Sequence, residues 1–296
     1  MTRTPTWTVV AHSLDTLKQV AGGYSQAHRG LVVLPDGNVI FVKLGTEEAT
    51  RKWAKKEIAV YRFLRSQGYT FVPDLLATKH DETAFALEAI TETGGWSWAA
   101  SWTSERLEAT LIAMDALAAI EPVGADRVYL SQTAIDDGDD GWRPLAGSQE
   151  LREALLGRLR AVGRPELADQ TDFQAMADRS HQFALSNDVL VHNDVRSDNC
   201  AWNPTTGRVM LVDWNWAQLG DRRIDVSSLL VSVQRAGLEL IPDYADRLDK
   251  DALHWLAGFW LRAAVTPMWK GGPASLRDSQ LHSGLIALDL ERRIPT

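Results

Sequence analysis

The sequence predicts an α+β protein with a small, β-rich N-terminal lobe that contains one long helix and a larger, mostly helical C-terminal lobe. In the first ninety or so residues, short apolar runs are separated by turn residues, which is typical of strands joined in hairpins. From about Thr93 the apolar residues recur with helical spacing instead. We therefore expect an N-terminal lobe over residues 1–92 and a C-terminal lobe over residues 93–296.

Two hairpins and one helix are expected in the N-terminal lobe. Residues 30–45 (GLVVLPDGNVIFVKLG) contain two β-rich runs joined by Pro-Asp-Gly, a strong signal for a tight turn. Residues 75–90 (LLATKHDETAFALEAI) have the pattern of a second hairpin. Between them, residues 47–68 begin with acidic residues and end in Gly68, which predicts a long helix.

Helices are expected through most of the C-terminal lobe. Apolar residues recur at helical spacing over residues 104–120, 148–162 and 164–185. Two or three more helices are expected after residue 222.

Composition excludes several classes of protein. The formal net charge of −8 argues against a nucleic-acid-binding protein that relies on phosphate neutralisation, and it is compatible with a cationic small substrate. The most apolar stretch, residues 253–269, is interrupted by His254, Arg262 and Pro267, so we expect a buried helix and no membrane span. The single cysteine, Cys200, rules out an internal disulfide and fits the cytoplasm, where we expect the protein to act.

One position of the helix in the N-terminal lobe is unusual. Glu57 falls within the apolar stripe of residues 54–64. A buried carboxylate needs a cation or several hydrogen-bond donors, and Lys43, at the end of the preceding strand, is the nearest candidate in the sequence. The alternative is that Glu57 lies at the edge of the stripe and is solvated, and the helix by itself leaves both open.

Residues 189–203 (VLVHNDVRSDNCAWN) change abruptly from an apolar run to a cluster of polar residues, with Asp194 and Asn199 five positions apart. The next segment, residues 200–216 (CAWNPTTGRVMLVDWNW), has two short apolar runs around a Pro-Thr-Thr-Gly turn. This pattern predicts a hairpin that brings Asp213 back beside Asn199.

The residue types in these two segments suit phosphoryl transfer. The side-chain oxygens of Asn199 and Asp213 are hard ligands of the kind that hold Mg²⁺ together with substrate phosphates. Asp194 is a carboxylate that can accept a proton from an attacking hydroxyl, and Arg196 would add positive charge for the transferring group. Together with a strand lysine held by a helix glutamate, these parts make up the apparatus of a kinase.

The order of these parts resembles the aminoglycoside phosphotransferase and choline kinase superfamily, which has a protein-kinase-like fold. Residues 192–199 (HNDVRSDN) resemble the catalytic loop of that family, and residues 211–230 (LVDWNWAQLGDRRIDVSSLL) resemble its metal-binding aspartate segment. The resemblance covers nearly the whole chain. It implies a bilobal protein-kinase-like fold that binds ATP between its lobes and holds the acceptor in the helical lobe.

The resemblance also implies roles for individual residues. Asp194 would be the catalytic base, and Asn199 and Asp213 would bind Mg²⁺. Lys43 would contact the α- and β-phosphates of ATP and would be held in place by Glu57.

Further roles concern the nucleotide base and the catalytic loop. The resemblance implies that the backbone of residues 86–90, with Glu88 and Ile90, meets adenine, and that Asp225 braces the catalytic loop through hydrogen bonds. We interpret His192 as a buried structural histidine that orients this loop.

Two clues to the acceptor disagree. Asn193 stands where aminoglycoside kinases usually carry glycine, and His-Asn-Asp is more similar to choline and ethanolamine kinases. The segment after Asp213 is more similar to the aminoglycoside branch. The loop at residues 22–30 lacks the glycine spacing of a protein kinase, and the chain lacks the activation-segment pattern of such enzymes, so a protein substrate is not expected.

The sequence therefore predicts an ATP- and Mg²⁺-dependent phosphotransferase, a small-molecule kinase, with GTP as the alternative donor. An aminoglycoside-type antibiotic is one candidate acceptor, and choline, ethanolamine or a sugar are the others. Most of the twelve tryptophans are expected in the core, with one or two in the acceptor pocket, where an aromatic face can bind an ammonium group.

Two other functional classes stay open at this point. One is a catalytically silent nucleotide-binding protein with the kinase fold. The other is a metal-dependent hydrolase with His192, Asp194 and Asp213 as ligands. The oligomeric state is also left open.

Overall fold

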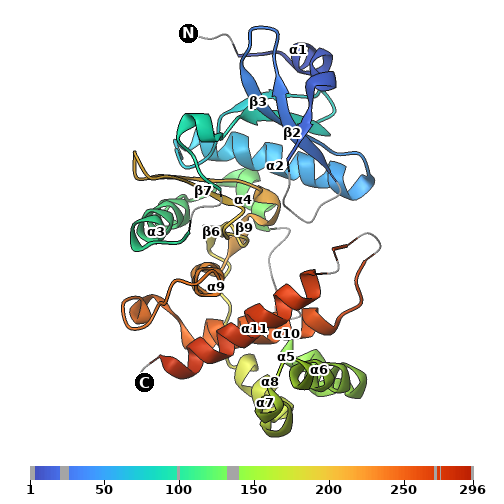
Figure 1. Ribbon diagram of the computed structural model, residues 1–296, viewed down its shortest axis with the longest axis vertical. Helices are drawn as coiled ribbons and strands as arrows, with labels where there is room; N and C mark the ends of the chain where they lie inside the picture. The colour runs from blue at the N-terminus through green and yellow to red at the C-terminus, as the bar shows by residue number, and fades with distance from the viewer. Residues whose placement is uncertain are drawn as a thin grey trace. The chain divides into compact units, whose positions relative to one another are not determined.

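The computed structural model describes residues 4–20, 27–98, 101–131, 140–269, 272–273 and 275–294. A five-stranded antiparallel sheet lies in the N-terminal part of the chain, and the C-terminal part is mainly helical (Figure 1). The predicted α+β fold is confirmed.

The chain divides into two compact units. One comprises Met1–Val128 together with Asp194–Ala217, and the other comprises Tyr129–Asn193 together with Gln218–Thr296. The first unit therefore holds the sheet and also the polar segments that follow Asp194. The lobe boundary expected near residue 92 stays a prediction.

Both predicted hairpins of the N-terminal part are present in the sheet, whose strand order is β1-β2-β3-β5-β4. The strands are β1 (Lys18–Gln19), β2 (His28–Val33), β3 (Val39–Leu44), β4 (Leu75–Thr78) and β5 (Ala84–Glu88). The turn between β2 and β3 has the expected chemistry, because Asp36 Oδ1 accepts a hydrogen bond from the backbone N–H of Asn38 at 3.0 Å and Gly37 adopts a positive φ of 85°.

One face of the sheet packs on the apolar core of the N-terminal part, which includes α1 (Trp7–His12). Its buried side chains are Val10, Val32, Leu34, Ile40, Val42 and Ala86. Successive residues of a strand point to opposite faces, so Lys43 lies on the face opposite that of Val42. This leaves the lysine on the side of the sheet away from that core.

The predicted long helix is α2 (Glu48–Ser66), which packs against β3, β4 and β5. Its first turn is capped reciprocally, because the Glu47 side chain accepts from the backbone of Thr50 and the Thr50 side chain accepts from the backbone N–H of Glu47. Glu57 is only 1% exposed within the apolar stripe. The alternative interpretation of Glu57 as a solvated edge residue is therefore wrong, because the stripe is packed on both sides of it.

The second predicted set of strands also belongs to the first unit. β7 and β8 form the hairpin expected after the polar cluster, and α3 packs against β8 (Figure 1). The remaining elements of this part are η1 (Leu14–Thr16), η2 (Glu92–Gly94), α3 (Ser104–Ala118), β7 (Cys200–Asn203), β8 (Arg208–Leu211) and η4 (Trp214–Trp216). The helix α4 (Gly124–Ser131) spans the division between the two units.

The second unit consists of helices and one short antiparallel strand pair, β6 with β9. Its elements are α5 (Trp142–Gly147), α6 (Gln149–Ala161), α7 (Pro165–Gln170), α8 (Phe173–His181), β6 (Val189–Val191), β9 (Gln218–Gly220), α9 (Arg222–Arg235), η5 (Ala245–Arg247), α10 (Lys250–Val265) and α11 (Leu276–Arg293). α10 packs along α11, and it is the buried helix expected from the most apolar stretch.

Residues 164–185, where the apolar spacing predicts helical structure, form two short helices, α7 and α8. The second helix begins after Asp172, whose side chain accepts hydrogen bonds from the backbone N–H groups of Gln174 and Ala175, both at 3.0 Å. This N-cap starts a new helix where the apolar spacing alone suggests a continuous one.

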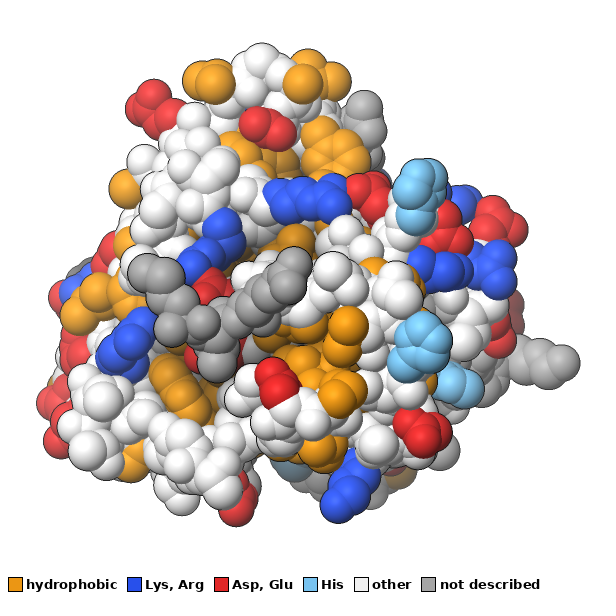
Figure 2. Space-filling model, turned by 90° about the horizontal axis from the view of Figure 1, so that it is seen from above, with side chains coloured by type: hydrophobic (Ala, Val, Ile, Leu, Met, Phe, Trp, Pro, Cys, Tyr) orange, Lys and Arg blue, Asp and Glu red, His pale blue; other side chains and the backbone are white. Residues whose placement is uncertain are grey.

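Charged residues of both signs are mixed on one face of the surface (Figure 2). On the face shown in Figure 2, basic and acidic side chains lie close to one another with hydrophobic side chains between them. Exposed pairs such as Lys52 with Glu48 contribute little to stability because water screens them. Within the described ranges, no helix has both the length and the apolar character needed to cross a membrane.

Candidate active site

A buried lysine joins two carboxylates in the first unit. Lys43 Nζ lies 2.5 Å from Glu57 Oε1 and 2.8 Å from Asp213 Oδ1. Lys43 is 4% exposed and Glu57 is 1% exposed. Three elements supply these groups, namely β3, α2 and the segment that follows β8. The predicted contact between Lys43 and Glu57 is therefore present.

The electrostatics of this cluster keep the lysine charged. Burial by itself would lower the pKa of Lys43, but the carboxylates of Asp213 and Glu57 outweigh it and raise the pKa to about 12. Burial raises the pKa of Glu57 to about 7, although the neighbouring ammonium group of Lys43 acts in the opposite direction. A cation fixed in this way is suited to binding an anionic ligand.

The hairpin of β7 and β8 brings two predicted metal ligands together. Cys200 is aligned with Leu211 in the ladder, and the N–H of Val212 donates to the carbonyl of Asn199 at 3.0 Å. Asn199 therefore lies next to the residue that precedes Asp213. The prediction that this hairpin returns Asp213 to the side of Asn199 is confirmed.

The backbone of Asp213 is in the left-handed region, with φ 66° and ψ 61°. Aspartate adopts this conformation more readily than most residues other than glycine. The next residue, Trp214, is fully buried and its Nε1 donates to the carbonyl of Leu211 at 3.1 Å. Asn215 Nδ2 donates to Asp213 Oδ1 at 2.8 Å. These contacts fix the orientation of the Asp213 carboxylate toward Lys43.

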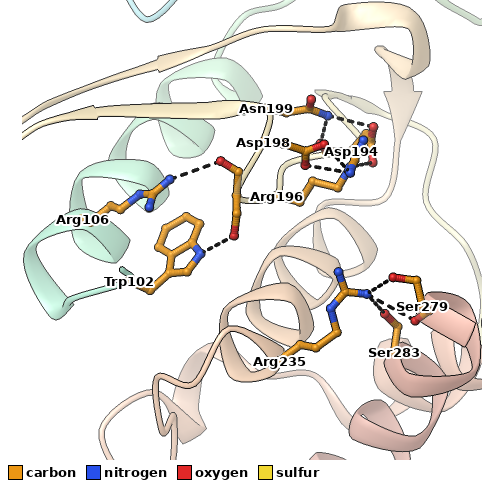
Figure 3. Close-up of polar contacts among 10 residues, drawn as sticks. Trp102, Arg106, Asp194, Arg196, Asp198, Asn199, Arg235, Ser279 and Ser283 are labelled. Atoms are coloured by element: carbon orange, nitrogen blue, oxygen red, sulfur yellow. Dashed lines mark hydrogen bonds and ion pairs between the residues drawn. The ribbon is translucent and has the colours of Figure 1, made fainter. Parts of the chain in front are cut away.

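Residues of the predicted catalytic loop, 192–199, form a second polar cluster (Figure 3). Arg196 Nε donates to Asp194 Oδ1 at 2.9 Å, and Arg196 Nη1 donates to Asp198 Oδ2 at 2.7 Å. Asn199 Nδ2 donates both to the backbone carbonyl and to Oδ2 of Asp194, each at 2.8 Å. Because the amide nitrogen of Asn199 is directed at Asp194, its Oδ1 is the atom that can serve as a ligand.

The pKa of Asp194 is raised to about 7. Loss of hydration is the largest cause, and the charges of Asp213 and Asp198 act in the same direction, while Arg196 opposes them. The side chain of Asp194 nevertheless keeps 27% of its surface exposed. A carboxylate with these properties can exchange a proton near neutral pH with a group that reaches it from solvent.

Asp225 holds the start of the catalytic loop in the second unit. Its carboxylate accepts hydrogen bonds from the backbone N–H groups of His192 at 3.2 Å and Asn193 at 2.7 Å. Asn193 has a positive φ of 62°, a conformation that glycine and asparagine adopt more readily than other residues. His192 is fully buried. The interpretations of Asp225 as a bracing residue and of His192 as a buried residue are confirmed.

The predicted hinge lies at the end of β5. Glu88 is exposed, whereas Ile90 is 8% exposed and packs with Ala201 and Met210. The carbonyl of Ile90 accepts a hydrogen bond from Trp98 Nε1 at 3.0 Å, a contact that sequence reasoning missed. Within the described part of the chain, the backbone N–H of Ile90 donates to no other group. The backbone N–H of Ile90 is thus the group of this residue that can donate a hydrogen bond to a nucleotide base at the predicted hinge.

Two further contacts of the catalytic loop come from residues that the sequence did not single out. Trp102, just before α3, and Arg106, in its first turn, donate hydrogen bonds to Ser197 and Cys200. The position of Arg106 could have indicated such a contact. The residue lies on the buried stripe of its helix and in the first turn, where a positive charge is unfavourable.

The hydrolase alternative requires a cluster of metal-binding side chains. Among the described residues, no group of three His, Cys, Asp or Glu side chains is arranged to hold a metal ion. Of the loop expected over residues 22–30, residues 22–26 lie outside the described residues, and residues 28–30 belong to the strand β2.

Comparisons with known proteins identify the family of this chain and structures that share its fold. Residues 16–259 match the model of a family described as the phosphotransferase enzyme family. No curated protein matches the chain at a significant level of similarity.

Solved structures of low sequence identity share the fold. An aminoglycoside phosphotransferase from Alicyclobacillus acidocaldarius is 14% identical with a TM-score of 0.59, covering 97% of this chain and 93% of that one. The choline kinase LicA from Streptococcus pneumoniae is 12% identical with a TM-score of 0.57, covering 96% and 98%. A ternary complex of streptomycin, ATP and APH(2")-IIa is 15% identical with a TM-score of 0.52, covering 94% and 95%.

These similarities confirm the predicted superfamily and its kinase-like fold, and the family match confirms the prediction of an enzyme that transfers phosphoryl groups. The matched segment contains Lys43, Glu57, Asp194, Asn199 and Asp213. It covers most of the chain, and the chain belongs to the phosphotransferase enzyme family.

Proposed function

We propose that the protein is an ATP- and Mg²⁺-dependent kinase that phosphorylates a hydroxyl group of a small molecule. One observation carries this proposal more than any other. The buried ammonium group of Lys43 contacts both Glu57 and Asp213. The strand lysine, the helix glutamate and the aspartate after the hairpin therefore form one cluster.

Lys43 and the hinge would bind the nucleotide. Glu57 holds the ammonium group of Lys43 in one place, where it can contact the α- and β-phosphates. The backbone at Glu88 and Ile90 would meet the adenine ring, with the N–H of Ile90 as a donor. ATP is the favoured donor because a structure with this fold contains ATP, and GTP is the alternative.

Asn199 and Asp213 fit the requirements of Mg²⁺. Both present hard oxygen atoms, and the hairpin register places them side by side. Mg²⁺ usually takes one or two carboxylates plus substrate phosphates, so two protein ligands suffice. When bound, the ion would neutralise charge on the phosphates.

Asp194 and Arg196 would act at the transferring group. Asp194 orients the acceptor hydroxyl and takes its proton as the acceptor oxygen bonds to the γ-phosphorus. The bond from that phosphorus to the oxygen it shares with the β-phosphate breaks, and ADP leaves. Arg196 supplies positive charge near the transferring group and, through its bond to Asp194, fixes the direction of the carboxylate.

The acceptor is proposed to carry a positive charge, as an aminoglycoside, choline or ethanolamine does. The net charge of −8 supports this class. In the turn after Asp213, Trp214 is fully buried, whereas Trp216 is 58% exposed and can present an aromatic face to an ammonium group. A sugar is the uncharged alternative. The protein is proposed to work in the cytoplasm.

The test is phosphate transfer from labelled ATP with Mg²⁺ to a panel of aminoglycosides, choline, ethanolamine and simple sugars. The Asp194→Ala protein serves as the blank. A product made only by the wild type supports the kinase and names its acceptor class. Binding of Mg²⁺–ATP without any product would favour the catalytically silent alternative. If neither ATP nor GTP binds, the proposal fails.

A further inference from the structure

Two side chains at the start of α3 contact the stretch of catalytic loop that carries Asn199 (Figure 3). Trp102 Nε1 donates to Ser197 Oγ at 2.9 Å. Arg106 Nη2 donates to the carbonyl of Cys200 at 2.6 Å and to that of Ser197 at 3.4 Å. These contacts reach the loop immediately before and immediately after Asp198 and Asn199.

The placement of Arg106 is costly for its own helix. The residue is 0% exposed, and removing a guanidinium from water is unfavourable unless hydrogen bonds replace its hydration. Arg106 also lies in the first turn of α3, where the helix dipole disfavours a positive charge. The bonds to two loop carbonyls contribute to offsetting this cost, as does the Trp102 ring, whose centroid lies 4.1 Å from the guanidinium carbon.

The loop needs donors at this place. The backbone N–H of Asn199 donates to the carbonyl of Arg196 at 2.9 Å, which closes a turn with Ser197 and Asp198 in its centre. That turn uses the carbonyl of Arg196, and the carbonyl of Ser197 accepts a hydrogen bond from Arg106 instead.

The same face of α3 supports the contact over two helical turns. The Thr103 side chain accepts from the backbone N–H of Arg106 at 3.3 Å, and Thr110 Oγ1 donates to the carbonyl of Arg106 at 2.8 Å. Thr110 Oγ1 also lies 3.4 Å from Cys200 Sγ. The helix therefore presents Arg106 from a fixed backbone.

Building on the proposed function, we propose that Trp102 and Arg106 are positioning residues for the metal ligand Asn199. They fix the backbone from Ser197 to Cys200, so that the Asn199 amide stays on Asp194 and its Oδ1 stays available to Mg²⁺. A lysine cannot replace Arg106 here, because one ammonium group cannot lie flat on the indole and also reach both carbonyls.

The chain offers a matched control. Arg235 on α9 donates from Nη1 to the backbone carbonyl of Ser279 at 3.3 Å and to the hydroxyl groups of Ser279 at 2.9 Å and Ser283 at 3.2 Å (Figure 3). It also ties two chain segments together, but its hydrogen-bond partners belong to α11 and not to the proposed site.

The experiment compares full-length wild type, Arg106→Lys and Arg235→Lys. The first readout is the Mg²⁺ concentration that gives half-maximal ATP binding, measured by calorimetry without an acceptor. The second is amide hydrogen exchange of residues 196–200, which needs neither nucleotide nor activity. Arg106→Lys should raise the Mg²⁺ requirement about tenfold, as expected for loss of a group that orients a ligand, and should speed exchange in this segment. Arg235→Lys should change neither.

The proposal is overturned if folded Arg106→Lys shows wild-type exchange in residues 196–200 and a Mg²⁺ requirement within twofold of wild type. If that variant does not fold, Trp102→Phe and Ser197→Ala replace it, since each removes one partner of the Nε1–Oγ hydrogen bond. Each variant should raise the Mg²⁺ requirement. The proposal is overturned if neither variant does.

The two proposals fail separately. If the wild type binds no nucleotide, the kinase function fails, whereas the exchange rates still decide whether Trp102 and Arg106 hold the loop. If the wild type binds Mg²⁺–ATP and folded Arg106→Lys behaves like the wild type in both readouts, the positioning role fails while the kinase function stands.

Discussion

Lys43 and Asp213 are 170 positions apart in the chain, yet the ammonium group of one lies 2.8 Å from the carboxylate of the other. The same ammonium group also contacts Glu57 at 2.5 Å. Each carboxylate raises the pKa of the lysine, so the charge on Lys43 depends on both carboxylates. The relationship places the proposed phosphate-binding lysine directly beside a proposed Mg²⁺ ligand.

Removing Lys43 should leave the buried carboxylate of Glu57 and the partly buried carboxylate of Asp213 without their shared cation. We expect Lys43→Met to lower the free energy of unfolding by about 3 kcal/mol, the lower end for breaking a buried ion pair, because Glu57 can take up a proton. Lys43→Met with Glu57→Gln should recover part of this loss, as measured by urea unfolding of both proteins. The control is Lys52→Met, which breaks an exposed pair with Glu48 and should leave the free energy of unfolding close to that of the wild type, because water screens the pair.

Asp194→Ala should act on turnover rather than on nucleotide binding. A base works mainly in the transition state, so kcat should fall by about 10²- to 10⁴-fold while the Kd for Mg²⁺–ATP stays within about threefold. Asp198→Asn removes the other carboxylate on Arg196 and should have a smaller effect, because Arg196 keeps its bond to Asp194. Equal losses in the two variants would contradict the role of Asp194 as base.

Asp213→Ala should remove the metal dependence of nucleotide binding. The variant loses one of two proposed oxygen ligands, so ATP should bind with about the same weak affinity with Mg²⁺ as in EDTA. Calorimetric titration of the wild type and the variant, each with and without the metal, measures this. A variant whose ATP binding still tightens with Mg²⁺ to the wild-type extent would rule out Asp213 as a ligand.

Asn193 offers a test of the loop backbone. Its φ of 62° is open to glycine but costs about 1 kcal/mol or more for a residue such as alanine. Asn193→Gly should therefore keep stability and turnover close to wild type, whereas Asn193→Ala should lose about 1 kcal/mol of stability. Thermal unfolding and initial rates of both proteins would show this difference, and an alanine variant as stable as the glycine variant would contradict it.

The buried carboxylate of Asp225 should give stability a particular pH dependence. Burial raises its pKa to about 6 from 3.8, although the N–H groups of Asn193 and His192 oppose the shift. The folded protein thus binds a proton more tightly than the unfolded chain. The resulting stabilisation is complete below about pH 3.8 and is lost as the pH rises through about 6.

The Asp225→Asn variant has no ionisable group at this position. The loss of stability that Asp225 causes as the pH rises should therefore be absent from the variant. Over this pH range the free energy of unfolding of the wild type should fall relative to the variant by up to about 3 kcal/mol. Urea unfolding at several pH values from 4 to 7 gives the two curves. Parallel curves would show that the pKa of Asp225 is not raised in the folded protein.

Much of the fold and part of the candidate site followed from local sequence patterns. Pro35-Asp36-Gly37 between two β-rich runs predicted the first hairpin, and helical spacing predicted α2. The hairpin register placed Asp213 beside Asn199 because both lie at the ends of strands joined by a short turn. The apolar spacing over residues 164–185 did not place the break between α7 and α8, because a side chain that caps a new helix can interrupt a continuous apolar stripe.

The sequence by itself determined the order of the parts, namely a strand lysine, a helix glutamate, a loop with Asp194 and Asn199, and an aspartate after a hairpin. Turn chemistry and the periods of strand and helix act over a few residues, so they can be recognised along the chain. Only the tertiary structure decided that Glu57 is buried on Lys43, that Trp98 occupies the carbonyl of Ile90 and that Arg106 holds the catalytic loop. Those contacts depend on how distant segments pack, because a buried polar group takes whichever partner the fold brings within hydrogen-bond distance.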